Sequence, residues 1–459
     1  MQVYDVVLIG TGQATGTLVS SLLEDGKSIA VVEGDRVGGS CVNWGCTPTK
    51  TLVASARAAH MARRGDDFGV RVSDFSVDYS RVHERVDAMR MPATEGFQKW
   101  LKQATDFYKG WASFVDDRTV EVGDRQFQGR EIIIHTGTRA RNPAFPGIDT
   151  VPWLDNKGIL DLTELPTHLL VIGGSYIGLE FAQAFRRLGS EVTVIQRSDR
   201  LVTKEGADVG TMVHDALTDE GISIELNTRI ERLETADTGV RVRFTREGEA
   251  GSVEGSHVLV GIGRMPNSDT LNPAAAGVEV DSKGFITVDD HTRTTVPHIY
   301  AVGDVNGRGA FTHTSVHDGQ VVLDQLLGAP TGRQPRKISD RTPVHSMFID
   351  PPLARVGMTE SEARASGRTV LMATREMSRI NRAREKDETR GVVKLLVDAD
   401  DRSILGATIF GVGGDEIIGM LALAMQTGLP YTALQDTVLP HPTVSELIPW
   451  IFDDLQPLE

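Results

Sequence analysis

The sequence predicts an α/β protein with two Rossmann-like dinucleotide-binding domains, followed by a C-terminal α+β domain. Two patterns of strand, glycine turn and helix predict the first two domains, one starting near residue 3 and the other near residue 169. Apolar strands at 392–397 and 404–410, followed by an amphipathic helix at 416–425, predict the third. A chain of 459 residues is long enough to fold as two or three such domains.

The first pattern has the glycines of a dinucleotide-binding turn. After the strand at 3–9, Gly10 makes the tight turn and Gly12 lets the backbone approach a pyrophosphate at a helix N-terminus. Glu33, at the end of the next strand, can bind an adenosine ribose. The third glycine position holds Thr15 instead, so we expect slightly looser packing of the helix on the strand.

The second pattern has basic residues where an acidic one is common. A strand at 169–172 leads into a turn at Gly173, and the following strand ends at Gln196, with Arg197 and Arg200 beyond it. A carboxylate at that strand end would repel a 2′-phosphate, whereas Gln196 with Arg197 would accept one. We therefore expect NADPH rather than NADH, although an arginine in a loop can also be simply solvated. Ser175, in the second glycine position, should push backbone and pyrophosphate slightly apart.

The only two cysteines, Cys41 and Cys46, lie close together after the first turn. Two such thiols can cycle between dithiol and disulfide. The alanine-rich stretch that follows predicts a helix with both sulfurs in its first turns, where the helix N-terminus favours a thiolate. The alternative is a pair of buried structural cysteines or half of a metal site. Because a metal site would need further Cys or His residues nearby, we expect no metal here.

The charge balance excludes some classes of partner. Lys+Arg of 48 against Asp+Glu of 63 gives 48 − 63 = −15, with no long basic run, which argues against nucleic acid. No apolar run is long enough to span a membrane, and no targeting segment precedes the first strand. We expect a soluble, cytoplasmic protein.

Four segments together resemble the pyridine nucleotide–disulfide oxidoreductases, the family of glutathione reductase, lipoamide dehydrogenase and mercuric reductase. They are residues 38–50 around the cysteines, the run from Tyr176 to Glu180, Gly303-Asp304, and the run from His441 to Glu446. The resemblance covers essentially the whole chain. It implies an FAD-containing enzyme that passes electrons from NADPH through FAD to the Cys41–Cys46 disulfide.

The resemblance also implies roles for single residues. Lys50 would lie near flavin N5 and pair with Glu180, Asp304 would hold the ribityl chain, and the Tyr176 ring would cover the nicotinamide pocket until NADPH displaces it. The expected FAD-binding residues are Gly10, Gly12, Glu33, Gly39, Lys50, Thr136, Gly137 and Asp304, and the expected NADPH-binding residues are Gly173, Tyr176, Gln196, Arg197, Arg200 and Gly263.

The pair His441 and Glu446 has the chemistry of an acid–base group and its support. Thiol–disulfide exchange needs a group that takes a proton from the attacking thiol and returns it to the leaving thiol, and imidazole titrates in the right range. Glu446 can hold the other ring nitrogen, although the two residues can also be solvated helix positions. In the family this histidine reaches the disulfide of the other subunit, which implies a homodimer.

The resemblance divides the chain into four parts. Residues 1–147 and 269–335 would form the FAD-binding domain, residues 148–268 the NAD(P)H-binding domain, and residues 336–459 the dimerisation domain.

The substrate is the least determined feature. Segments 351–359 and 381–391 resemble the mercuric-reductase-like branch, which includes enzymes of defence against reactive chlorine species. With only two cysteines, the chain has no outer pair to pass Hg(II) inward. We expect a small disulfide of the glutathione or bis-γ-glutamylcystine type as substrate.

Several alternatives stay open. One is a reductase of reactive oxidants or metal ions, such as hypothiocyanous acid, Cu(II) or, less readily, Hg(II). A second is a lipoamide dehydrogenase, against which Gln196 argues, and a third is a non-catalytic flavin-binding scaffold. His313 and His317 can line the substrate or flavin pocket, bind copper, or be ordinary helix positions.

Overall fold

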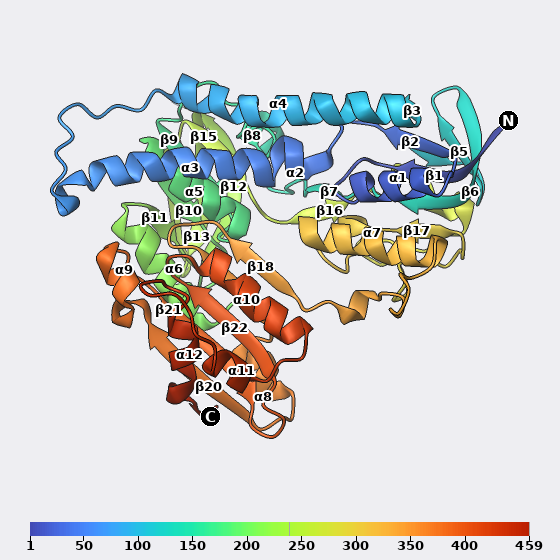
Figure 1. Cartoon of the computed structure of the whole chain (residues 1–459). Helices are drawn as coiled ribbons and strands as arrows, with labels where there is room; N and C mark the ends of the chain where they lie inside the picture. Colours follow the sequence, from blue (N-terminus) through green and yellow to red (C-terminus); the bar gives the residue numbers. More distant parts are fainter. Residues whose placement is uncertain (238, 459) are drawn as a thin grey trace. The chain divides into compact units, whose positions relative to one another are not determined.

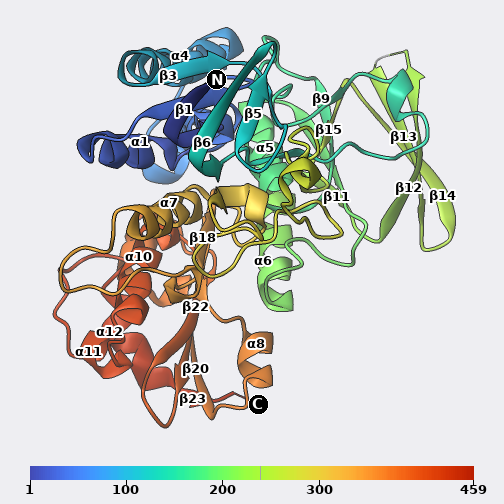
Figure 2. The ribbon, with the colours of Figure 1, turned by 90° about the vertical axis from the view of Figure 1, so that its right-hand side faces the viewer.

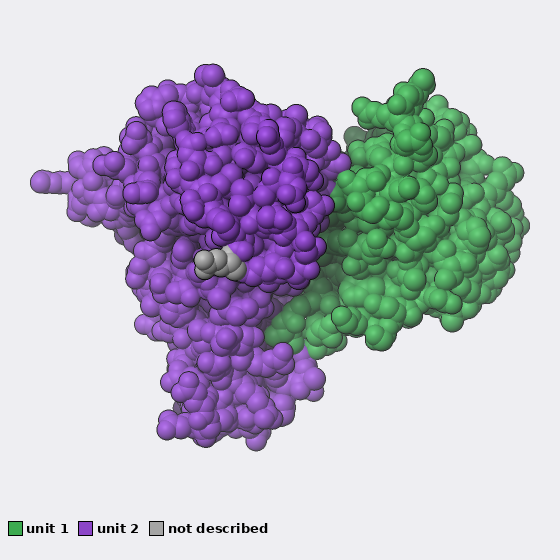
Figure 3. Space-filling model, turned by 90° about the horizontal axis from the view of Figure 1, so that it is seen from below, with its two compact units in different colours: residues 1–51, 81–142, 262–341 green, residues 52–80, 143–261, 342–459 purple. Residues whose placement is uncertain are grey.

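The protein is described by a computed structural model of residues 1–237 and 239–458. The chain forms two compact units, each assembled from separate segments. Unit 1 consists of residues 1–51, 81–142 and 262–341, and unit 2 of residues 52–80, 143–261 and 342–459 (Figure 3). Among the described residues, no helix combines the length and the apolar character needed to cross a membrane.

Unit 1 is built on a sheet with the strand order β3-β2-β1-β6-β5-β4, in which β17 pairs with β6. The contacts among β1, β2, β3, β6 and β17 are parallel, and β4 and β5 add an antiparallel edge. The strands are β1 Gln2–Ile9, β2 Ile29–Glu33, β3 Asp106–Lys109, β4 Ala112–Phe114, β5 Thr119–Val122, β6 Arg125–Ile134 and β17 Ile299–Ala301. A small antiparallel pair, β7 Thr138–Ala140 and β16 Arg264–Pro266, lies beside it.

Alternate side chains of β1 face the two sides of the sheet, and each side packs into its own core. Val6 and Leu8 face a core shared with helices α1 (Thr15–Glu24) and α7 (Thr312–Leu326), whereas Val7 and Ile9 face the opposite core. Figure 1 shows α1 and α7 side by side. The parallel sheet and its helices confirm the first predicted Rossmann-like domain.

Unit 2 contains a second parallel sheet, with the strand order β11-β10-β9-β15-β8. Its elements are β8 Trp153–Leu154, β9 His168–Ile172, α5 Tyr176–Leu188, β10 Glu191–Ile195, α6 Ala207–Asp219, β11 Ser223–Glu225 and β15 His257–Val260. An antiparallel sheet of β12 Thr228–Ala236, β13 Gly239–Arg246 and β14 Glu249–Gly255 is inserted before β15, and Figure 2 shows its three strands side by side. This confirms the second Rossmann-like domain.

The C-terminal part of unit 2 is an antiparallel sheet with helices, as the sequence predicts. Its strand order is β18-β19-β22-β21-β20-β23, and α10 and α12 contribute to one core against it. The elements are β18 Val344–Met347, β19 Leu353–Gly357, α8 Glu360–Ala365, β20 Val370–Glu376, α9 Asn381–Glu385, β21 Val392–Asp398, β22 Ile404–Phe410, α10 Gly414–Gln426, α11 Tyr431–Gln435, α12 Leu447–Ile451 and β23 Gln456–Pro457.

The remaining helical segments lie within one unit or the other, except that α3 and α4 each continue from one unit's segment into the other's. They are α2 Gly39–Trp44, α3 Cys46–Arg63 and α4 Tyr79–Ala104, together with the short 3₁₀ turns η1 Gly65–Phe68, η2 Ile148–Thr150, η3 Pro273–Ala276, η4 Gly303–Asn306, η5 Ile338–Asp340, η6 Met377–Arg379 and η7 Phe452–Asp454.

The antiparallel sheet depends on Gly391, just before β21. This residue has φ +111°, and a Cβ atom there would lie 1.8 Å from the carbonyl oxygen of Phe410. Gly391→Ala should therefore lower the free energy of unfolding by about 3 kcal/mol, measured by urea denaturation. Gly367→Ala, at φ +73° and with open space around it, should cost only about 1 kcal/mol. Equal losses in the two variants would contradict the steric argument.

Candidate active site

The two cysteines lie on two helices, not on one as the sequence suggested. Cys41 is in the short α2, and Cys46 is the first residue of α3. Gly45 interrupts the helix with φ −133° and ψ −119°, and a Cβ atom on it would lie 2.8 Å from the carbonyl oxygen of Ser40. The break places Cys46 at the N-terminus of an 18-residue helix, where a thiolate is stabilised.

A buried asparagine holds α2 in place. The Asn43 amide donates to the carbonyl oxygens of Val37 at 2.9 Å and Gly39 at 3.0 Å. Its own side-chain oxygen accepts the hydroxyl of Thr94 from α4 at 2.8 Å. The polar groups of this buried side chain are therefore paired, so the position of Cys41 is determined by a rigid support.

The sulfurs share one proton between them. The hydrogen bond from the Cys41 thiol has the largest effect on Cys46, and together with smaller effects of Thr312 and of the positive charge of Lys50 it outweighs burial and lowers the pKa of Cys46 to about 6. The same hydrogen bond, together with burial, raises the pKa of Cys41 above its usual range. In the dithiol state Cys46 is thus the thiolate and Cys41 the thiol at neutral pH.

Thr312 contacts both sulfurs and was not found by sequence reasoning. Its hydroxyl donates to Cys41 Sγ at 3.1 Å and lies 3.4 Å from Cys46 Sγ. Because Thr312 is the first residue of α7, the N-termini of two helices, α3 and α7, meet at the cysteine pair. Nothing in the local sequence marks this threonine, because the contact joins residues more than 260 positions apart.

The two histidines of α7 differ in exposure. His313 is exposed and stacks on Phe311, with ring centroids 5.5 Å apart. His317 is half-buried, and burial lowers its pKa. Within the residues that the structure describes, no group of three His, Cys, Asp or Glu side chains is placed to hold a metal ion.

The first dinucleotide turn fits a flavin nucleotide. Gly10, with φ +99°, lies so close to β6 that a Cβ atom would come within 2.3 Å of the carbonyl oxygen of His135. Gly39, with φ +64°, lies against Gly12. A Cβ atom built on Gly39 would lie 3.2 Å from the Cα atom of Gly12. At Gly10 and Gly39 the turn therefore packs against backbone atoms, and glycines without side chains permit the close approach that a pyrophosphate requires.

Further polar groups of unit 1 fit the rest of such a ligand. The buried Glu33 carboxylate accepts the backbone N–H groups of Thr11 at 3.0 Å and Asp35 at 2.7 Å, which holds it at the end of β2. The hydroxyl of Thr136 is buried and makes no hydrogen bond within the described chain, and Gly137 follows it with φ +65°. Asp304 lies on η4 and accepts the Thr138 hydroxyl at 2.8 Å.

The second dinucleotide turn is stabilised by Gln196. Its side-chain oxygen accepts the Gly174 N–H at 3.1 Å, and its amide donates to the carbonyl oxygen of Arg200 at 3.2 Å. Arg197 is exposed, and the Nε atom of Arg200 is buried without a hydrogen-bond partner in the described chain. The loop after β10 therefore presents guanidinium groups to solvent and to its own turn, with no carboxylate at the strand end. Gly263 lies in unit 1, with φ +115°.

Tyr176 belongs to a buried polar cluster within unit 2. Its hydroxyl donates to the Glu205 carboxylate at 2.5 Å and lies 2.7 Å from His345 Nε2. Arg355 forms an ion pair with the same carboxylate at 3.2 Å. Burial opposes ionisation of Glu205, but His345, Tyr176 and Arg355 together hold its pKa below the usual value. Glu205, His345 and Arg355 were not found from the sequence, since three separate segments supply them.

The predicted pair of Lys50 and Glu180 stays a prediction, because Lys50 belongs to unit 1 and Glu180 to unit 2. Within unit 1, the charge of Lys50 helps to lower the pKa of Cys46. Within unit 2, the buried Glu180 carboxylate accepts the Phe348 N–H at 2.8 Å.

His441 and Glu446 are hydrogen-bonded, as their spacing suggested. His441 Nδ1 lies 2.9 Å from a Glu446 carboxylate oxygen, just before α12 begins at Leu447. The histidine side chain is 70% exposed and the glutamate 18%, so the imidazole points its free nitrogen outward while the carboxylate holds it from behind. An exposed imidazole that is held by a carboxylate can exchange protons with a group that approaches from solvent.

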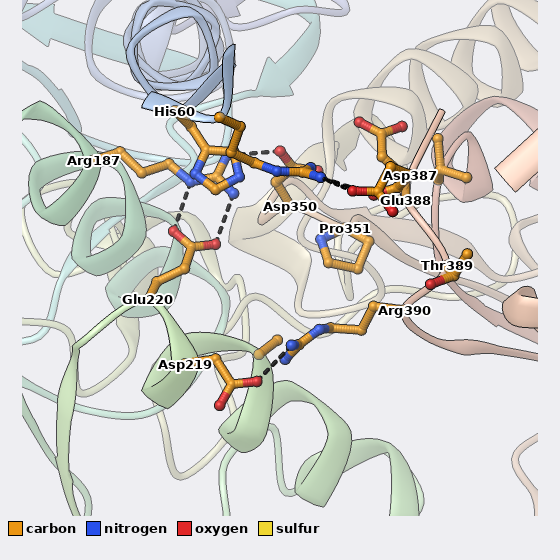
Figure 4. Close-up of a pocket in the computed structure, with 13 residues that line it drawn as sticks. His60, Arg187, Asp219, Glu220, Asp350, Pro351, Asp387, Glu388, Thr389 and Arg390 are labelled. Atoms are coloured by element: carbon orange, nitrogen blue, oxygen red, sulfur yellow. Dashed lines mark hydrogen bonds and ion pairs between the residues drawn. The ribbon is translucent and has the colours of Figure 1, made fainter. Parts of the chain in front are cut away.

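A separate polar cavity of about 300 Å³ in unit 2 contains none of the predicted site residues (Figure 4). Arg187 pairs with Glu220 and with Asp350 at 2.7 Å each, and Asp350 also pairs with Arg57 at 2.6 Å. These pairs fasten α5 and the end of α6 to the segment before β19. We assign the cavity to structure rather than to catalysis.

Comparisons with known proteins agree with this geometry. Residues 4–319 match the model of the pyridine nucleotide-disulphide oxidoreductases, and residues 344–452 match the dimerisation domain of the same family. The chain therefore belongs to the pyridine nucleotide-disulphide oxidoreductases, enzymes that use FAD and a nicotinamide nucleotide. The dimerisation domain supports a homodimer.

The relatives come from several branches of the family. The chain is 36% identical over 461 residues to the probable pyridine nucleotide-disulfide oxidoreductase RclA of Escherichia coli, covering 98% of this chain and 99% of that protein. It is 32% identical to a mercuric reductase of Bacillus cereus, covering 96% of this chain and 70% of the reductase. It is 30% identical to a dihydrolipoyl dehydrogenase of Geobacillus stearothermophilus, with 96% and 94% covered.

A solved structure shows the same fold. The HOCl-induced flavoprotein disulfide reductase RclA from Escherichia coli superposes with a TM-score of 0.88 at 34% sequence identity, over 98% of this chain and 99% of that one.

The shared proton of the cysteine pair makes a testable prediction. In the reduced protein, the rate of alkylation of Cys46 by iodoacetamide should rise as pH increases through about 6, because only the thiolate reacts. Thr312→Val removes a hydrogen bond to both sulfurs and should move this midpoint to higher pH. Thr314→Val loses two hydroxyl contacts to the Phe311 backbone, to the carbonyl oxygen at 2.7 Å and from the N–H at 3.2 Å, but none to a sulfur, so it should leave the midpoint unchanged. An unchanged midpoint in Thr312→Val would show that the threonine does not stabilise the thiolate.

Proposed function

We propose that the protein is an NADPH-dependent, FAD-containing reductase of a small disulfide. The observation that carries the proposal is the polarised cysteine pair, with a Cys46 thiolate and a Cys41 thiol at the meeting point of two helix N-termini. A structural pair would need neither a lowered thiol pKa nor a charged lysine one turn further along.

The two sulfurs divide the reaction between them. Bound FAD would supply the two electrons that open the Cys41–Cys46 disulfide, taking them from the nicotinamide. Cys41, deprotonated by His441, attacks a substrate disulfide and releases the first thiol, which takes up the proton from the imidazole. The Cys46 thiolate then attacks the Cys41 sulfur, re-forms the internal disulfide and releases the second half of the substrate as a thiolate, which takes up a proton from solvent.

Residues of unit 1 would bind FAD. The glycine turn at Gly10 and Gly12 would hold the pyrophosphate, Glu33 the adenosine ribose, and Asp304 the ribityl chain. The buried hydroxyl of Thr136, beside Gly137, supports a polar ligand at this place. Lys50 would lie at the flavin and pair with Glu180.

The division of the chain follows from these roles. Residues 1–147 and 269–335 would form the FAD-binding domain, 148–268 the NAD(P)H-binding domain, and 336–459 the dimerisation domain. A cytoplasmic location suits an enzyme that draws on NADPH and keeps thiols reduced.

The second candidate is reduction of a reactive oxidant or of a metal ion. The relative with 34% identity is described as HOCl-induced, and it has also been solved as a Cu(II) complex. Hypothiocyanous acid would take the two electrons at the same cysteine pair, and Cu(II) one electron per ion. Hg(II) reduction is not proposed, because the chain has no cysteines besides Cys41 and Cys46.

A substrate screen separates the two candidates. We expect NADPH oxidation with glutathione disulfide or bis-γ-glutamylcystine to exceed that with lipoamide, hypothiocyanous acid or Cu(II). The Cys41→Ser variant should lose this turnover while the flavin is still reduced by NADPH. Turnover only with the oxidants would favour the second candidate, and no turnover with any of them would contradict a reductase.

The proposed preference for NADPH leads to a separate prediction. Arg197→Glu places a carboxylate where a 2′-phosphate would bind, so it should lower kcat/KM for NADPH by about tenfold or more and leave NADH use nearly unchanged. Arg229→Glu, an equal change of charge at a side chain that is 78% exposed on β12, is the matched control. A wild-type protein that already prefers NADH would contradict the preference.

The homodimer and the role of His441 are tested together. Apolar side chains of the dimerisation domain are exposed in the single chain, among them Leu423, Val438 and Trp450, which suits a surface that another copy covers. His441→Ala should slow substrate reduction by about 10²–10⁴-fold, while flavin reduction by NADPH stays nearly normal. His214→Ala, at a partly exposed histidine beside Asp215, should have no such effect.

Mixing two inactive proteins shows whether His441 acts across the dimer. After subunit exchange between Cys41→Ser and His441→Ala proteins, each heterodimer would contain one site with both native residues, so activity should return. Verified exchange without recovered activity would place His441 and Cys41 of one chain in the same site.

A further inference from the structure

A buried histidine lies beneath the first dinucleotide turn, where the second turn has a glycine. The carbonyl oxygen of His135 lies 2.3 Å from a Cβ atom built on Gly10, and the carbonyl oxygen of Gly261 lies 2.4 Å from one built on Gly173. Each carbonyl belongs to the residue directly after its strand, β6 or β15. His135 and Gly261 therefore occupy corresponding positions in the two folds.

The third glycine position of the motif also differs between the two folds. In the second fold Gly178 lies against Gly261, with a Cβ built on Gly261 only 3.7 Å from the Gly178 backbone. Helix and strand thus approach each other directly. In the first fold Thr15 and His135 replace these glycines, and the Thr15 hydroxyl lies 3.3 Å from His135 Nδ1. The departure at Thr15 is therefore matched by a side chain that contacts the threonine, where the second fold has a second glycine.

The imidazole also supports two separate turns of unit 1. A Cβ atom on Gly12 would lie 2.7 Å from the ring, and a Cβ atom on Gly303 would lie 3.4 Å from its Cδ2. On the other side, His135 Nε2 lies 2.8 Å from the hydroxyl of Ser315, in the first turn of α7. One side chain thus touches the turn before α1 and the turn that carries Asp304.

The ring is neutral under ordinary conditions. Burial lowers the pKa of His135 to about 4. A neutral imidazole has one donor and one acceptor nitrogen, and the hydroxyls of Thr15 and Ser315 can satisfy both in either tautomer. Both nitrogens of the buried imidazole therefore have a hydrogen-bond partner, as a buried polar side chain requires.

We propose that His135 is a positioning residue for FAD. Held between Thr15 and Ser315, its ring sets the spacing between the turn at Gly12, which would bind the pyrophosphate, and the turn at Gly303, next to Asp304 and the ribityl chain. The inference rests on FAD as the cofactor of the proposed function. It assigns the affinity for FAD partly to a residue that does not touch the cofactor.

Release of FAD from the purified protein tests the proposal, followed by flavin fluorescence after dilution. His135→Ala removes the ring and both hydrogen bonds, so the dissociation constant should rise about tenfold or more. His135→Gln keeps one donor and one acceptor within reach of both hydroxyls and should stay within about threefold of the wild type. Ser315→Ala should show a milder loss, and the double variant His135→Ala/Ser315→Ala no more than His135→Ala alone.

A matched histidine in the other unit serves as control. His168 Nε2 lies 2.9 Å from the Thr193 hydroxyl in the second dinucleotide fold, so His168→Gln should leave FAD release unchanged. The thermal unfolding temperature is recorded for every variant. A His135→Ala protein that is less stable but keeps FAD within twofold of the wild type would overturn the proposal, as would equal losses in the Ala and Gln variants.

Two further results are decisive. If His135→Ala does not fold, Ser315→Ala carries the test, and unchanged release in that variant would overturn the proposal. A wild-type protein that binds no FAD would instead refute the proposed function, because every variant would then behave like the wild type.

Discussion

A proton shared by two sulfur atoms is the interaction on which the proposed reaction depends. The hydrogen bond from Cys41 to Cys46 gives one sulfur a negative charge and keeps the other protonated. The fold stabilises this asymmetry through the break at Gly45, which turns Cys46 into a helix N-terminus, and through Thr312, which brings a second helix N-terminus to the pair. On one continuous helix, the two thiols would have more similar pKa values.

The two dinucleotide folds share one arrangement of strand, glycine turn and helix but differ in the side chains around it. Both make the same close contact, between the first glycine of the turn and the carbonyl group of the residue that follows β6 or β15. Beyond this contact they diverge. The second fold keeps its helix and strand in direct backbone contact, and its loop carries Gln196 and arginines. The first separates them by a hydrogen-bonded imidazole and adds η4 with Asp304.

Sequence reasoning succeeded where function lies in contiguous residues. The glycine turns, the cysteine spacing and the hydrogen bond between His441 and Glu446 are local patterns, and local backbone geometry determines them. The two parallel sheets followed from the same signals. The break between α2 and α3 was missed because the alanine-rich stretch after Cys46 favours a helix, whereas the close approach of Gly45 to Ser40 is a property of the folded chain.

Contacts between segments far apart in the chain could not be predicted from the sequence. Thr312 reaches the cysteines, and His345 reaches Tyr176, only because sheets place the ends of far-separated elements together. His135 was visible at the end of an apolar strand, but its meaning depends on Ser315, which lies 180 residues further along the chain. The third-glycine departure at Thr15 was noticed without its partner, since no local pattern connects the two.

Placing both of the chain's cysteines in the reaction centre has a practical consequence. Every free thiol that a colorimetric reagent detects on the native or the denatured protein belongs to that centre. Two thiols per chain report the reduced form, and none reports the disulfide. A mixed population can therefore be quantified by mass spectrometry after alkylation, without engineering and without background from other sulfhydryl groups.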